Sequence, residues 1–259
     1  MRRSASILLA ATAFLSVTGA VAVAGTLIGT ETDDQLQGTP SPDQIYGEGG
    51  NDRLAGNGSN DYLEAGTGDD AVEGGDGVDL AIAGTGTDTV DAGPGNDVVY
   101  AGAGEDLVLG GTGADTLFGQ SEADRMFGGS GADRIYASLG GDYVEGGSGA
   151  DRISSDDGDV TIRAGSGDDV VTADGGSIAV SGGRGEDRIR TGSGADRVRG
   201  GPDPDSIDTG AGDDEINARD RTRDRIRCGE GRDVVATDRT DLVTGCESVR
   251  TGFRGGRIR

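Results

Sequence analysis

The sequence contains no histidine, lysine or tryptophan, and only 3% of its 259 residues are aromatic. Without histidine the chain cannot form a Ser-His-Asp triad, a Cys-His pair or an H-E-x-x-H zinc site. Hydrophobic residues make up 33%, against roughly 45–50% apolar residues in typical globular domains, so a thick core is not expected. The 47 acidic residues, 23 basic residues and formal charge of -24 would suit a disordered acidic chain, unless a sequence pattern indicates otherwise.

The first 24 residues differ from the rest of the chain. Arg2 and Arg3 precede an apolar run from Ile7 to Val23, which ends in the small residues Ala22-Val23-Ala24. We interpret residues 1–24 as a cleaved signal peptide, which predicts a secreted, extracellular protein with no transmembrane segment after cleavage. The alternative is an uncleaved membrane anchor, because the run approaches spanning length.

An aspartate recurs every nine residues through most of the chain. Two residues after each aspartate an aliphatic residue follows, with Ala81 as the one small substitute. The acid is missing from this frame only at Val160 and Ile178, where the aliphatic residue is still kept. The frame comprises Asp34, Asp43, Asp52, Asp61, Asp70, Asp79, Asp88, Asp97, Asp106, Asp115, Asp124, Asp133, Asp142, Asp151, Asp169, Asp187, Asp196, Asp205 and Asp214.

A repeat of nine residues is too short to fold alone, so it must bury its aliphatic residue against neighbouring repeats, as in a solenoid. The glycines of each repeat allow a turn with positive φ, and the three residues centred on the aliphatic residue form a minimal strand. Each repeat reverses the chain once, so two repeats complete a coil. The pattern therefore predicts an all-β solenoid with 18-residue coils.

Five repeats match the pattern G-G-x-G-x-D-x-U-x, where U is an aliphatic residue and is the small Ala81 in the first of them: 74–82, 110–118, 128–136, 146–154 and 182–190. In this pattern the chain resembles the hemolysin-type (RTX) calcium-binding repeat proteins, over about residues 29 to 235. The resemblance implies a parallel β-roll with calcium between the loops of successive coils, held by aspartates and by carbonyls of the glycine loops. Such oxygen ligands suit the hard Ca²⁺ ion.

Alternate repeats turn at opposite edges of the predicted roll, so the aspartates form two ridges with one aspartate per coil. On the first ridge, from Asp79 to Asp187, glycine stands two and four residues before every aspartate. The predicted calcium ligands on both ridges are Asp52, Asp70, Asp79, Asp88, Asp97, Asp106, Asp115, Asp133, Asp151, Asp169, Asp187, Asp196 and Asp214, with loop glycines Gly75, Gly77, Gly111, Gly113, Gly129, Gly131, Gly147, Gly149, Gly183 and Gly185.

The second ridge is less regular. Its loops depart from the glycine pattern before Asp124 and Asp142, and the acid is absent at Val160 and Ile178. We therefore predict few metal ions on this ridge between about residues 119 and 181. The loops GTPSPD and GGPDPD also depart from the pattern, and a solvated turn is an alternative for their aspartates.

Acidic charge is concentrated in the first half of the predicted roll. Residues 26 to 124 contain 21 acids and a single arginine. Carboxylates stacked at a coil spacing of about 4.8 Å repel one another, by on the order of 1 kcal/mol per pair even in water. One aliphatic residue per half coil does not offset this repulsion together with the entropy of ordering the backbone. The sequence therefore predicts a roll that folds when calcium binds.

The outward residues of one predicted sheet include an apolar column at 18-residue spacing, formed by Ile82, Tyr100, Phe118 and Tyr136. This column is either cross-strand stabilisation of a narrow sheet or a surface for a glycan, a cell-surface polymer or another extracellular partner. The leading function is a non-enzymatic, structural or surface-associated calcium-binding protein, and a calcium-dependent adhesion module is the alternative.

An enzymatic alternative is a polysaccharide lyase or hydrolase built on a β-helix, using paired carboxylates and calcium. Acids outside the frame exist for it, such as Glu64, Glu73, Asp91 and Glu145. No loop is long enough to wall a cleft, so we expect no enzyme. We also expect no nucleic-acid partner, because the basic C-terminal end lacks interleaved aromatic residues apart from Phe253.

The two cysteines, Cys228 and Cys246, lie one coil apart in sequence. If the frame persists they stack at strand spacing, which predicts a disulfide in a secreted chain. After residue 218 the nine-residue spacing of the aspartates shifts and glycine becomes less frequent, so we divide the chain into four parts. These are a signal peptide (1–24), a repeat roll (25–218), irregular terminal coils with a disulfide cap (219–249) and a basic tail (250–259).

Overall fold

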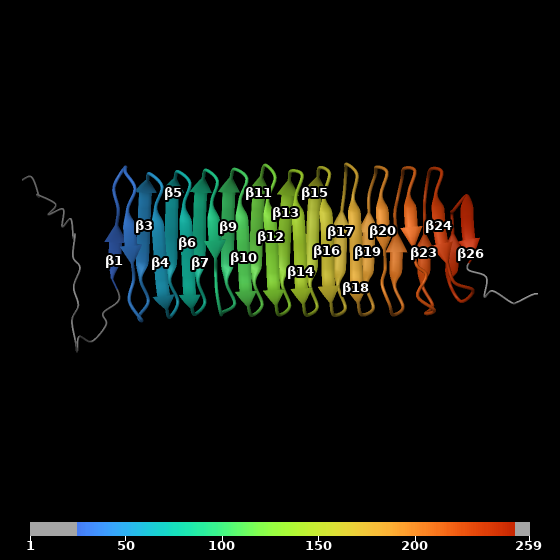
Figure 1. Cartoon of the computed structure of the whole chain (residues 1–259), viewed down its shortest axis with the longest axis horizontal. Coiled ribbons are helices and arrows are strands. Elements are labelled where there is room, and N and C mark those ends of the chain that lie inside the picture. Colours follow the sequence, from blue (N-terminus) through green and yellow to red (C-terminus); the bar gives the residue numbers. More distant parts are fainter. Residues whose placement is uncertain (1–24, 252–259) are drawn as a thin grey trace, which may run out of the picture.

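A computed structural model describes residues 25–251, and all regular structure within that range is β-strand. The strands wind into a straight rod with β1 at one end and β26 at the other (Figure 1). The predicted signal peptide and all but the first two residues of the predicted tail lie outside the described residues. No helix in the described part is long and apolar enough to cross a membrane.

Two parallel sheets of 13 strands each form the flat faces of the rod, and the chain passes from one sheet to the other at every turn. Sheet A contains β1 (Thr26–Ile28), β3 (Gln44–Gly49), β5 (Tyr62–Thr67), β7 (Leu80–Thr85), β9 (Val98–Ala103), β11 (Thr116–Ser121), β13 (Arg134–Leu139), β15 (Arg152–Asp157), β17 (Val170–Ala173), β19 (Arg188–Thr191), β21 (Ser206–Asp208), β23 (Arg225–Arg227) and β25 (Leu242–Thr244). Sheet B contains β2 (Gln35–Gln37), β4 (Arg53–Gly58), β6 (Ala71–Asp76), β8 (Thr89–Asp91), β10 (Leu107–Thr112), β12 (Arg125–Ser130), β14 (Tyr143–Ser148), β16 (Thr161–Ser166), β18 (Ala179–Arg184), β20 (Arg197–Arg199), β22 (Glu215–Asn217), β24 (Val234–Thr237) and β26 (Ser248–Thr251).

The predicted parallel roll of 18-residue coils is confirmed. Leu117 pairs with Val99 on one side and with Ile135 on the other, each one coil away. Most strands in the middle of the rod have six residues, which is longer than the three predicted. The extra residues belong to the glycine loop, because the backbone groups of the loop also pair with the next coil, as Gly111 does with Gly129.

The core consists of two rows of aliphatic side chains, one from each sheet. The frame aliphatics from Ile45 to Val235 are almost fully buried, including Ala81. The inward residue two positions later is small, as at Ala65 and Ala101, because the roll is too narrow for a second large side chain. Each coil therefore buries little apolar area, which limits the stabilisation that the core provides.

The two sheets continue beyond residue 218 with the spacing altered. Asp205 and Asp224 are 19 residues apart but occupy neighbouring coils, because the turn between β22 and β23 contains one additional residue. The strands then run on to β26 without a separate capping element in the part of the chain that the structure describes. The predicted disulfide is confirmed: Cys228 and Cys246 are bonded, with their Cα atoms 5.2 Å apart.

Replacing Cys228 and Cys246 together by serine should destabilise the terminal coils. The bond closes a loop with a sequence separation of 18, and losing such a link costs about 3 kcal/mol through the entropy of the unfolded chain. We expect hydrogen exchange in β23 to β26 to accelerate in the double variant, while exchange in β9 to β14 stays unchanged. Equal exchange in both regions of the variant and the wild type would contradict this expectation.

Candidate calcium site

The frame aspartates stand in the turns between the two sheets. The first ridge lies where sheet B leads into sheet A, as at Asp115 between β10 and β11. The second ridge lies where sheet A leads into sheet B, as at Asp106 between β9 and β10. The two ridges expected from the sequence are thus the two opposite edges of the roll.

The glycine loops bring the backbone of successive coils into close contact at these edges. Gly111 and Gly113 have φ values of +102° and +132°, which L residues with a side chain rarely adopt. A Cβ on Gly111 would lie only 2.1 Å from the carbonyl oxygen of Gly93 in the preceding coil. All ten glycines predicted to belong to calcium loops have positive φ, which explains why glycine is required there.

One oxygen of each frame carboxylate is used by the protein itself. The backbone N–H of Asp97 donates to Oδ1 of Asp115 at 2.9 Å, and the N–H of Asp115 donates to Oδ1 of Asp133 at 2.9 Å. The same bond links successive aspartates along both ridges at one-coil spacing, except at Val160 and Ile178 on the second ridge. These bonds form two ladders that fix the carboxylates at the edges of the roll.

The second carboxylate oxygen has no partner within the described residues. The Oδ2 atoms of all thirteen predicted ligand aspartates are buried without a hydrogen bond. A buried charged oxygen without a partner is costly. A repeating row of such atoms therefore indicates that a positive ion or a proton belongs to this arrangement.

Carbonyl oxygens converge with these carboxylate oxygens. A Cβ placed on Gly146 would be 2.6 Å from Oδ2 of Asp151 and 2.5 Å from the carbonyl oxygen of Ala164, one coil further on. A Cβ on Gly128 would meet Oδ2 of Asp133 and the carbonyl oxygen of Gly146 in the same way. Carboxylate and carbonyl oxygens from two coils are the mixed donor set that Ca²⁺ accepts.

Burial raises the pKa of frame carboxyls such as those of Asp115 and Asp97. The pKa of Asp115 rises to about 6, chiefly because the group is removed from water, and the Asp97 N–H that it accepts only partly opposes this rise. The pKa of Asp97 rises to about 7 for the same reason, increased further by the neighbouring carboxylates of Asp115 and Asp79. A nearby cation would lower these pKa values, because it stabilises the charged form of the carboxylates.

The degenerate loop GTPSPD differs from the regular loops in one respect. Both the backbone N–H and the hydroxyl of Thr39 donate to Oδ2 of Asp43, at 2.5 and 2.9 Å. In the other loop in doubt, GGPDPD, Oδ2 of Asp205 remains without a partner. The structure therefore separates two loops that the sequence leaves equivalent.

On the second ridge the ladder extends further than its glycine pattern suggests. Asp106 donates its N–H to Asp124, and Asp124 donates to Asp142, as in regular coils. Oδ2 of Asp124 and of Asp142 is buried without a partner. Gln120 and Glu122 adopt the positive φ that glycine has elsewhere. The ladder of the second ridge is therefore interrupted only at Val160 and Ile178 within the described residues. This interruption is shorter than the segment of about residues 119 to 181 in which we predicted few metal ions.

Several frame aspartates absent from the predicted ligands have the same arrangement. Asp61 lies in the nine-residue frame, so its regular spacing could have placed it among the predicted calcium ligands. Asp224 and Asp233 were missed because one additional residue shifts them out of the nine-residue frame. The aspartates with a buried, unpartnered Oδ2 beyond the predicted set are Asp61, Asp124, Asp142, Asp205, Asp224 and Asp233.

Comparison with known families agrees with this geometry. The sequence matches the RTX calcium-binding nonapeptide repeat over residues 28–63, 49–81, 73–108, 82–117, 109–144, 118–153, 145–177 and 190–220. The chain belongs to this family. No curated protein matches the chain. RTX repeats bind several calcium ions and are typically structural units, and the two carboxylate ladders of this RTX roll fit that role.

The predicted outer column of the RTX roll lies on sheet A, where Ile82 pairs with Tyr100, and Phe118 pairs with Tyr100 and Tyr136. The rings of Tyr100, Phe118 and Tyr136 stack with centroids 4.7 Å apart and planes within 7° of parallel. The faces of the rings therefore cover one another along the rod. This favours the structural interpretation over a sugar platform, which needs an exposed ring face.

Proposed function

We propose that this protein is a secreted, non-enzymatic RTX protein whose roll folds when calcium binds along its two ridges and then serves as a rigid extracellular rod. The observation that carries the proposal is the row of buried Oδ2 atoms without partners. Secretion is supported by the signal-like residues 1–24. An extracellular medium supplies calcium at the concentrations that extracellular modules use, with Kd values of about 10⁻⁴ to 10⁻³ M.

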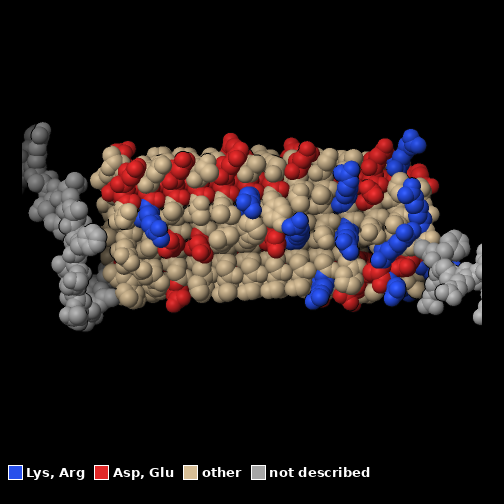
Figure 2. Space-filling model, in the orientation of Figure 1, with Lys and Arg blue, Asp and Glu red and all other residues tan. Residues whose placement is uncertain are grey.

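Charge distribution supports the same proposal. Figure 2 shows acidic side chains along one edge of the visible face, while arginines gather toward the C-terminal half of the rod. Salt bridges within the described residues are few and join exposed side chains, such as Arg53 with Glu73. None of these salt bridges within residues 25–251 involves a buried frame carboxylate, so bound calcium would supply the charge that neutralises them.

Calcium stoichiometry tests the assignment of the ridges. Asp133→Asn keeps an oxygen that accepts the Asp115 N–H but removes the negative charge beside the carbonyl oxygen of Gly146. We expect this variant to bind at least one calcium ion fewer than the wild type, measured by calorimetric titration or equilibrium dialysis. The loss follows because two neighbouring coils share each carboxylate.

Asp156→Asn is the matched control, because Asp156 is an exposed residue of β15 outside the frame. It makes the same change of charge and should leave the number of bound ions unchanged. An unaltered stoichiometry in Asp133→Asn would show that the first ridge does not hold calcium at this coil.

A further inference from the structure

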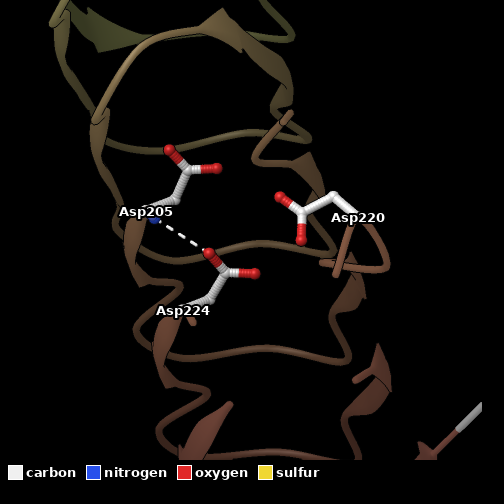
Figure 3. A group of neighbouring side chains, drawn as sticks. All are labelled: Asp205, Asp220 and Asp224. Atoms are coloured by element: carbon white, nitrogen blue, oxygen red, sulfur yellow. Dashed lines mark hydrogen bonds between the residues drawn. The ribbon is translucent and has the colours of Figure 1, made fainter. Parts of the chain in front are cut away.

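A group of three carboxylates lies where the regular repeats meet the terminal coils. Asp205 and Asp224 are neighbouring members of the first ridge, and Asp220 belongs to the turn that leads from β22 into Asp224. One carboxylate oxygen from each of the three residues lies within 4.8 Å of the other two. Figure 3 shows the side chain of Asp220 reaching across the turn toward the other two.

Two of these carboxylates are buried and lack a partner on the side that faces Asp220. Asp205 is 3% exposed and Asp224 is 0% exposed. Their Oδ2 atoms have no hydrogen-bond partner within the described residues. In Figure 3 one oxygen of each points toward the carboxylate of Asp220. The unpartnered oxygens therefore converge on a third negative group, which is unfavourable without a cation.

Hydrogen bonds hold the three groups in place. The N–H of Asp205 donates to Oδ1 of Asp224 at 2.8 Å, which continues the ladder. The backbone N–H and the hydroxyl of Thr222 donate to the two oxygens of Asp220 at 2.7 and 2.6 Å. The N–H of Asp220 donates to Oδ2 of Asp238 at 2.8 Å. The carboxylates are thus oriented before any ion binds.

No arginine neutralises this group in the described part of the chain. Arg219, Arg221 and Arg223 lie next to Asp220 or Asp224 in sequence, yet none of the ion pairs found in residues 25–251 involves Asp205, Asp220 or Asp224. The guanidinium of Arg219 instead donates to the carbonyl oxygen of Arg250. The group therefore keeps three acids with no basic partner.

The turn differs from the glycine loops on which the family pattern rests. Residues 218–223 contain no glycine, so the close approach of glycine backbones seen at Gly111 and Gly113 is absent. Asp220 instead adds a side-chain carboxylate. Ligands placed 2.3–2.6 Å from one calcium ion are at most about 5 Å apart, and the observed limit of 4.8 Å satisfies this requirement.

We propose that Asp205, Asp220 and Asp224 form a three-carboxylate calcium site that is independent of the glycine pattern and clamps the shifted turn onto the regular roll. The additional residue in this turn changes the spacing of neighbouring coils to 19 residues, and the ion adds a second link between these coils beside the ladder bond. The site rests on the proposed function, because Asp205 and Asp224 belong to the first ridge, and it extends that function with a third ligand, Asp220, from outside the repeat frame.

Calorimetric titration of the full chain with CaCl₂ tests the site through Asp220→Asn. The side-chain amide oxygen of the variant still accepts the Thr222 N–H, but the third negative charge is lost. We expect one calcium ion fewer than in the wild type, or an affinity for that ion that is at least tenfold weaker. Asp213→Asn is the matched control, because Asp213 is an exposed acid of the neighbouring turn on the second ridge, and its oxygen accepts the Arg232 N–H.

Hydrogen exchange locates the effect. Calcium should slow exchange in residues 219–230 of the wild type and of Asp213→Asn, but not of Asp220→Asn, while calcium protection of β10 to β13 persists in all three. Asp220→Glu retains a carboxylate and should recover the ion at least in part.

Three results would overturn the site. In the first, Asp220→Asn binds the same number of ions with the same affinity as the wild type. In the second, Asp220→Glu loses the ion as completely as Asp220→Asn, which would assign a purely structural role to the turn. In the third, calcium protects β10 to β13 but not residues 219–230 of the wild type. Absence of calcium binding anywhere in the wild type would instead count against the proposed function.

Discussion

Excess chelator should remove most of the β-structure of this protein, and millimolar calcium should restore it. Without the ion, each ridge stacks buried carboxylates one coil apart, about 4.8 Å, with no basic partner within reach in the described residues. Each coil buries few large side chains, such as Leu117 and Val108, which cannot offset both this repulsion and the ordering of the backbone. Circular dichroism during calcium titration measures the change.

Magnesium and sodium chloride are the controls for this experiment. Sodium chloride at equal ionic strength screens exposed charges but does not coordinate the buried Oδ2 atoms. Magnesium demands octahedral geometry and gives up its water reluctantly, so it should restore much less structure than calcium. A chain that keeps its full β-signal in excess chelator would contradict calcium-dependent folding.

Lowering the pH should have opposite effects on the calcium-free and the calcium-bound protein. Between pH 7.5 and pH 5, the calcium-free chain should gain β-structure, while the apparent affinity for calcium should fall at least tenfold. Both effects follow from the raised pKa values of the buried carboxyls, about 7 at Asp88 and Asp169 and about 6 at Asp151 and Asp187.

The direction of each effect follows from proton uptake. The ordinary pKa is 3.8, and burial raises it in the folded chain. Between these values the folded, calcium-free chain binds more protons than the unfolded chain, so its stability increases as the pH falls and is lost as the pH rises through 6 to 7. Calcium requires the ionised carboxylates, and protons therefore compete with it over the same interval.

Circular dichroism in chelator and calcium titrations at pH 5 and pH 7.5 measure the two effects. Sedimentation of each sample is needed as a control, because a chain near zero net charge associates more readily. A calcium-free chain that is more structured at pH 7.5 than at pH 5 would show that the carboxylates do not limit its folding. An affinity for calcium that is equal at both pH values would lead to the same conclusion.

Most of the architecture follows from the periodicity of the sequence. The aspartates recur every nine residues, and each is followed by a residue such as Leu117, Met126 or Ile135 that must be buried. A chain of glycine turns and short strands can bury these residues in a solenoid and in few other folds. The register is set because a shift by one residue would turn every aliphatic side chain outward. The disulfide followed from the same period, since one coil separates its cysteines.

The periodicity could not predict whether an individual carboxylate oxygen has a hydrogen-bond partner. Hydrogen bonding within a turn depends on rotamers and on the neighbouring coil, so Thr39 satisfying Asp43 is not visible in the repeat pattern. The repeat pattern also does not show that Gln120 adopts a positive φ, as glycine does in the regular loops. With this backbone conformation, the ladder of the second ridge continues from Asp124 to Asp142.

Local spacing in the sequence determined the coil length, the two ridges and the identity of the acids that line them, because a solenoid repeats contacts between residues at a constant separation. Only the folded chain decided which acids keep an unpartnered oxygen and that Asp220 joins Asp205 and Asp224. That juxtaposition arises where the period fails, and beyond such a point only the three-dimensional path of the backbone determines which side chains meet.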